Sequence, residues 1–85
     1  MSEYSIFILR RAQKELSQLS TDVYEDICCA VRNLANNPLP NGCLKLSGRE
    51  GYRIRVGKYR IIYEIDEGQK RVTILHIGHR RDIYR

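Results

Sequence analysis

The sequence has few of the features that mark secreted, membrane-spanning or zinc-binding proteins. It contains three cysteines, at positions 28, 29 and 43, and neither the odd count nor the spacing fits a disulfide framework or a zinc site. It also lacks a long apolar run, because the stretch from Ile6 to Leu9 is short and is followed by two arginines. We therefore expect a cytoplasmic protein with no signal peptide, no membrane span, no metal and no cofactor.

Acidic residues are scarce relative to basic ones in the second half of the chain. Residues 1–44 carry four basic and five acidic side chains, whereas residues 45–85 carry eleven basic and five acidic ones, so the two halves have charges of −1 and +6. This asymmetry favours a polyanionic partner such as a nucleic acid, or an acidic protein. A solvated basic surface that only aids solubility explains the charge alone equally well.

The order of the predicted elements indicates one small α+β domain over residues 1–85. Hydrophobic residues make up 42% of the chain and charged residues 29%, which is typical of a globular protein. The patterns predict strands at Tyr4–Leu9, Leu44–Leu46 and Val72–Gly78 and a helix at about Arg10–Leu19. They also predict a second helix that Ser20 or Thr21 can cap and that Asn36-Asn37-Pro38 ends. We expect the N-terminal strand and the two-helix hairpin to pack on one face of a small antiparallel β-sheet, whose other face is partly open and basic.

The most informative stretch is residues 51–65, GYRIRVGKYRIIYEI, which predicts two strands joined by a tight turn. Gly57 and Lys58 suit a two-residue type II′ loop, since the first position of that loop needs a positive φ and glycine adopts it without strain. Apolar residues alternate with Arg53 and Arg55 before the turn and with Arg60 after it. We expect these three arginines on one face of the sheet, where they would form a site for phosphates.

Arginine binds phosphate through its planar fork and stays charged at any physiological pH, so several arginines can stabilise a phosphoryl-transfer transition state without a metal. Arginine is a poor acid or base, and the candidates for moving a proton are Tyr84 and His79. An RNA 2′-hydroxyl deprotonated by such a group could attack the neighbouring phosphate. The alternative is that the strand arginines are only solvated. His76 and His79 should face opposite sides of one strand, so they do not form a metal pair. We expect His76 to be a packed or hydrogen-bonded histidine rather than a catalyst.

Two segments carry a resemblance to a known family. LSGREGYRIRVGKYRIIYEID, residues 46–66, and ILHIGHRRDIY, residues 74–84, resemble the RelE branch of the RelE/ParE toxin superfamily, and the upstream elements fit the same fold. The C-terminal segment GHRRDIY, residues 78–84, points to the RelE branch, because the gyrase-poisoning ParE branch usually lacks the terminal tyrosine. The resemblance implies a RelE-like toxin of a type II toxin–antitoxin system. Such toxins are metal-independent endoribonucleases that cleave mRNA in the ribosomal A site, leaving a 2′,3′-cyclic phosphate and a 5′-hydroxyl.

The resemblance also implies roles for individual residues. The matching positions are the paired strand residues Arg53 and Arg55, Arg60 after the turn, Arg80 in the tail and the terminal Tyr84. In similar enzymes the tyrosine is the general base and the arginines stabilise the phosphate.

The proton donor to the leaving oxygen is a separate question, because Arg55 stands where similar enzymes can carry a lysine that performs this step. We hypothesise that His79 is the acid, or that Arg55 only stabilises charge. We also expect RNA contacts from Lys45, Lys58 and Arg81, in addition to Arg53 and Arg55.

The implied partners are a cognate RelB-like antitoxin, forming a toxin–antitoxin hetero-oligomer, and the ribosome with its mRNA. Two other readings stay open. One is a ParE-like toxin that inhibits DNA gyrase without nuclease activity. The other is an RNA-binding module or inactivated toxin, which would bind RNA with strong salt dependence and cleave nothing.

Overall fold

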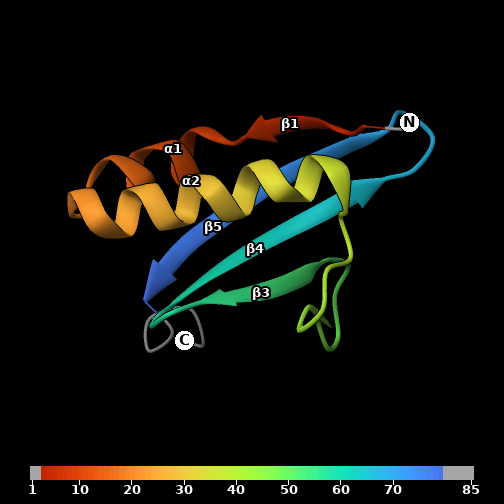
Figure 1. The fold of residues 1–85 in the computed structure, drawn as a ribbon. Coiled ribbons are helices and arrows are strands. Elements are labelled where there is room, and N and C mark those ends of the chain that lie inside the picture. Colours follow the sequence, from red (N-terminus) through yellow and green to blue (C-terminus); the bar gives the residue numbers. More distant parts are fainter. Residues whose placement is uncertain (1–2, 80–85) are drawn as a thin grey trace.

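The computed structural model describes residues 3–79 as one β-sheet with two helices on one side of it (Figure 1). In chain order the elements are β1 (Ser5–Ile8), α1 (Arg10–Ser17), α2 (Thr21–Asn36), β2 (Leu44–Lys45), β3 (Tyr52–Val56), β4 (Tyr59–Asp66) and β5 (Arg71–His79). The α+β class and the helix hairpin on one face of the sheet are confirmed. Neither helix in this part of the chain has the length and apolar character needed to cross a membrane.

The five strands lie in the order β1-β5-β4-β3-β2. Every pairing is antiparallel except one, because β1 runs parallel to β5 with Ile6 opposite Val72. A parallel pair needs a long crossover connection, and here the chain between the two strands passes through both helices and the other three strands. The sheet is therefore mixed rather than antiparallel throughout. The expectation that the N-terminal strand packs on one face of the sheet with the helices is wrong, because β1 hydrogen-bonds to β5 as an edge strand of the sheet itself.

The predicted hairpin forms with the expected turn. Val56 lies opposite Tyr59, so the loop consists of Gly57 and Lys58 alone. Gly57 has a φ of 60°, and within residues 3–79 the only non-glycine residue with a positive φ is Lys70. A positive φ at the first loop position and not at the second distinguishes the type II′ turn from type I′.

The core lies between α2 and the sheet. The buried stripe of α2 consists of Ile27, Val31 and Leu34, which pack against side chains of the three long strands. Tyr63 is the largest fully buried side chain, and its hydroxyl donates to the carbonyl of Pro38 at 2.6 Å. This bond ties the loop after α2 to the middle of β4.

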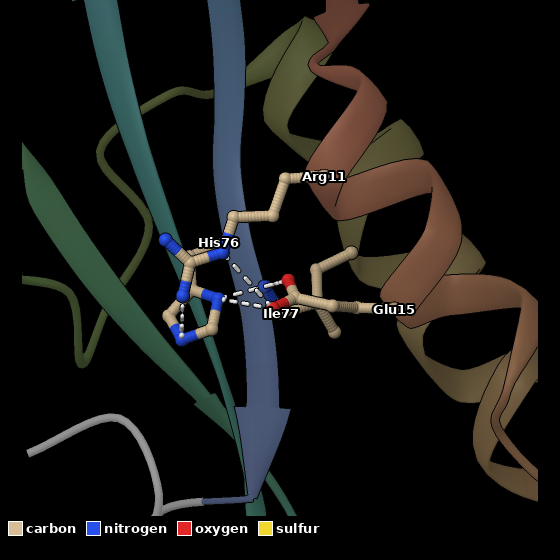
Figure 2. A network of polar contacts seen from close by, with 4 residues as sticks. All are labelled: Arg11, Glu15, His76 and Ile77. Carbon is tan, nitrogen blue, oxygen red and sulfur yellow. Dashed lines mark hydrogen bonds and ion pairs between the residues drawn. The ribbon is translucent and has the colours of Figure 1, made fainter. Parts of the chain in front are cut away.

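Helix α1 covers the edge of β5 beyond the end of β1. The pairing of β1 with β5 ends at the backbone hydrogen bond from the Leu9 N–H to the Ile74 carbonyl, at 3.0 Å. Further along, Glu15 Oε1 of α1 accepts the Ile77 N–H at 2.8 Å, in place of a carbonyl from a neighbouring strand (Figure 2). The same carboxylate contacts His76 Nδ1 at 2.7 Å and Arg11 Nε at 3.2 Å. The expectation that His76 is a hydrogen-bonded residue is confirmed, and this contact anchors the last turn of α1 to β5.

Candidate functional site

Arginines from neighbouring strands meet on one face of the hairpin. The register places Arg55 of β3 directly opposite Arg60 of β4, and Arg53 opposite Ile62. Residues directly opposite in a ladder share a face, so all three guanidinium groups lie on the face away from the core. In a hairpin with a two-residue loop, the Arg55–Arg60 pair is of the non-hydrogen-bonded type, in which opposite side chains are closest.

Burial of these three arginines differs along the face. Arg55 is exposed and Arg53 is half-buried, whereas Arg60 is only 5% exposed. The alternative reading, in which the strand arginines are only solvated, does not hold for Arg60. Taking a guanidinium out of water is costly unless polar contacts or anions compensate, and like charges directly opposite in a sheet destabilise it. The register therefore brings two positively charged side chains together on one face, where a bound anion could interact with both.

A pocket of about 410 Å³ adjoins this arginine cluster, which we define as Arg53, Arg55 and Arg60. Its walls come from the second half of α2, the segment before β2, and the strands of the hairpin. The lining residues are Ala30, Asn33, Pro40, Asn41, Gly42, Leu44, Arg53, Ile54, Arg55, Val56 and Arg60. Sequence reasoning missed the asparagines, since only the folded chain brings α2 and the 40–44 segment beside β3.

The two lysines expected to contact RNA lie at different places relative to the arginine cluster. Lys45 pairs with Tyr52, which places it on the opposite face of the sheet, and it lines a second cavity together with Glu50 and Glu64. Lys58 is exposed in the hairpin turn, two residues from Arg60. Of the two, only Lys58 is placed to extend the positive surface beside the cluster.

The histidines fall on opposite faces, as their spacing predicts. His76 pairs with Ile62, whereas His79 pairs with Tyr59 and meets its ring edge-on, with centroids 5.5 Å apart. Tyr59 packs against the core, so the ladder directs His79 to the helix-covered face. The structure therefore does not bring His79 together with Arg55 and Arg60.

Other predicted site residues lie outside the described part of the chain. These are Arg80, Arg81 and Tyr84, which remain predictions of the sequence. Within residues 3–79, no group of three or more histidine, cysteine or acidic side chains is placed to hold a metal ion. Tyr63 is an unsuitable base, because burial, with a further contribution from the nearby Cys43, raises its pKa above the ordinary value of 10.0.

Comparisons with known proteins agree on one family. The family model described as ParE toxin of type II toxin-antitoxin system, parDE, matches residues 6–84. The toxin RelE of Mycobacterium tuberculosis is 34% identical over 88 residues, covering 96% of this chain and 87% of the relative. The toxin RelG of the same organism is 31% identical over 84 residues, covering 96% of this chain and 97% of the relative.

Solved structures show the same fold. The RelE–RelB complex from Pyrococcus horikoshii OT3 contains a chain that superposes with a TM-score of 0.84 at 28% identity, covering 96% of this chain and 99% of that chain. The isolated RelE toxin of E. coli superposes with a TM-score of 0.79 at 24% identity, covering 95% of this chain and 90% of that chain. At that lower identity the likeness concerns the fold alone.

Proposed function

The chain belongs to the ParE toxin family of type II toxin–antitoxin systems, within the RelE/ParE superfamily, and we propose that it is a RelE-type endoribonuclease that cleaves mRNA on the ribosome. The single observation that carries the proposal is the Arg55–Arg60 pair, in which one of two directly opposed guanidinium groups is buried. A phosphate diester between them would remove their mutual repulsion. Charge that develops on that phosphate during cleavage would be stabilised further.

The proposed chemistry uses the roles that the resemblance implies for these residues. Tyr84, acting as a phenolate, takes the proton of the 2′-hydroxyl, and the 2′-oxygen forms a bond to phosphorus as the bond from phosphorus to the 5′-oxygen breaks. The arginine cluster, with Arg80, holds the non-bridging oxygens through bidentate hydrogen bonds. The products are a 2′,3′-cyclic phosphate and a 5′-hydroxyl, and no step requires a metal.

At the leaving oxygen we propose a role for Arg55 rather than for His79. Because Arg55 is exposed on the same face as Arg60, it can stabilise the negative charge on the 5′-oxygen until a proton arrives from solvent. His79 packs against Tyr59 on the other face, which disfavours it as the acid.

The proposed partners follow from the relatives. Several structurally similar proteins were solved as RelE–RelB complexes, and we expect this chain to form a hetero-oligomer with a cognate RelB-like antitoxin. The ribosome and its bound mRNA are the proposed target. Neutralisation would require the antitoxin to cover or displace the arginine cluster.

The experiment compares wild-type protein with Arg55→Ala and Arg32→Ala after brief induction, by mapping new mRNA 5′ ends across the transcriptome. Arg32 is exposed on α2, so its replacement removes the same charge away from the cluster. We expect cuts inside translated frames for wild-type protein and Arg32→Ala. Loss of a transition-state donor typically costs about 100-fold or more in rate, so cuts by Arg55→Ala should nearly vanish.

The second candidate function, inhibition of DNA gyrase, is favoured by the ParE description of the matching family. A supercoiling assay with purified gyrase separates the two. Growth arrest with intact mRNA and blocked supercoiling would replace the nuclease proposal with this one.

A further inference from the structure

One edge of β3 is left without a neighbouring strand beside the arginine cluster. Strand β2 pairs with Tyr52 and Arg53 only, and the Leu46 N–H continues this ladder by donating to the Gly51 carbonyl at 2.9 Å. Peptide groups in a strand alternate in direction, so those of Gly51, Arg53 and Arg55 point toward the β2 side. Because β2 begins at Leu44, the N–H and carbonyl of Arg55 face outward past its end.

The pocket of about 410 Å³ lies at this open edge. Within residues 3–79, no backbone hydrogen bond from the 37–43 loop reaches Arg55. The pocket walls combine apolar side chains, such as Ile54 and Val56, with the amides of Asn33 and Asn41. An apolar slot with a few hydrogen-bonding groups suits a flat ligand whose rim carries donors and acceptors.

We propose that this pocket binds one unstacked nucleobase of a single-stranded RNA whose phosphates lie on the arginine cluster. Asn33, Asn41 and the outward peptide groups of Arg55 contact the edge of the base, while the apolar walls cover its faces. Single-stranded RNA is recognised in this way, through bases turned out of the stack and read on their edges. The inference rests on the proposed function and adds to it the element that selects where the strand is cut.

The alternative occupant is a peptide strand from a protein partner, added to the edge of β3. Strand addition gains affinity from hydrogen bonds at alternate residues along an open edge. Here Arg55 is the only β3 residue whose outward groups lie past β2, and the turn begins two residues later at Gly57. So short an edge, next to three arginines, fits one base attached to a phosphate chain better than a strand.

The test compares the bases that flank the cuts made by wild-type protein, Asn33→Ala and Asn41→Ala, with Asn36→Ala as the control. All three asparagines are exposed, so truncation should leave the fold intact, and Asn36 does not line the pocket. Loss of one hydrogen bond worth about 1 kcal/mol corresponds to about fivefold in preference. We expect the base preference at one flanking position to fall by about that factor in Asn33→Ala and Asn41→Ala, and to persist in Asn36→Ala.

The outcomes separate this inference from the proposed function. Unchanged base preferences in both pocket variants, with cleavage retained, would overturn the nucleobase pocket and leave the nuclease intact. Weaker antitoxin binding in these variants with unchanged base preferences would also overturn it, by assigning the pocket to a peptide. If wild-type protein makes no cuts, the proposed function fails, and the pocket is judged by binding. If Asn41→Ala binds single-stranded RNA pentamers of one base about fivefold more weakly than wild-type protein does, the nucleobase pocket is supported. Equal affinities of the two proteins would overturn it.

Discussion

Replacing Glu15 with alanine should destabilise the protein more than its position on a short surface helix suggests. Its carboxylate accepts the Ile77 N–H at 2.8 Å and contacts His76 Nδ1 at 2.7 Å and Arg11 Nε at 3.2 Å. Ile77 is 1% exposed, so water cannot readily replace the carboxylate at its N–H. The substitution therefore leaves a buried donor unsatisfied as well as removing contacts between charged groups.

The magnitude follows from these contacts. An unsatisfied buried N–H costs about 1–3 kcal/mol, and a hydrogen bond to a charged group contributes about 1.5–3 kcal/mol, less where it is exposed. The side chains of Glu15 and His76 are 24% and 20% exposed, so we take the lower part of each range and expect a loss of about 2–4 kcal/mol in the free energy of unfolding. For a domain of this size, the melting temperature should fall by roughly 8 °C or more.

Urea unfolding of Glu15→Ala, Glu15→Gln and Glu25→Ala measures this loss. Glu15→Gln keeps an oxygen that can accept a hydrogen bond from the Ile77 N–H, so its free energy of unfolding should fall by only about 1 kcal/mol. Glu25 is exposed on α2, and its replacement should change stability by no more than about 0.5 kcal/mol. Hydrogen exchange of the Ile77 amide should quicken in Glu15→Ala. A loss no larger than that of Glu25→Ala, with unchanged exchange, would refute the reasoning.

Three further predictions concern single residues. Gly51→Ala should destabilise the protein more than Gly48→Ala. Both glycines have a positive φ, but of the two only Gly51 has atoms that an added Cβ would meet, at 3.1 Å. Equal losses of stability in urea unfolding would contradict this prediction. Tyr63→Phe removes the hydrogen bond to the Pro38 carbonyl and should lower the free energy of unfolding by about 0.5–1.5 kcal/mol at neutral pH. Because the folded-state pKa of Tyr63 is raised, the folded protein binds more protons than the unfolded chain above pH 10.0, so stability should fall there with rising pH, and less steeply in Tyr63→Phe. His79→Ala and His76→Ala should both cut RNA at nearly wild-type rates, whereas a much slower His79→Ala in a single-turnover assay would restore it as the acid.

The local features of the hairpin could be predicted from the sequence because short-range rules determine them. A glycine at the first turn position and a period of two fix the loop, the register and the common face of Arg53, Arg55 and Arg60. The apolar stripe of α2 is determined in the same way by the helical period.

Features that depend on contacts distant in sequence could not be predicted. Burial of Arg60 depends on what packs over the sheet, and strand alternation alone suggests exposure. The irregular register beside Tyr63, which places Ile74 and Ile77 in the same core three residues apart, breaks the period of two. The contact between Glu15 and Ile77 joins residues 62 positions apart.

The most direct test of the central claim is the chemistry of the cut ends. Purified protein would be incubated with ribosomes stalled on a defined mRNA, and the 3′ end of the upstream fragment would be identified by mass spectrometry. Attack by the 2′-hydroxyl predicts a 2′,3′-cyclic phosphate on that fragment and a 5′-hydroxyl on the other, with both products lost in Tyr84→Phe and Arg55→Ala. A 3′-hydroxyl on the upstream fragment, or uncut mRNA, would contradict the account.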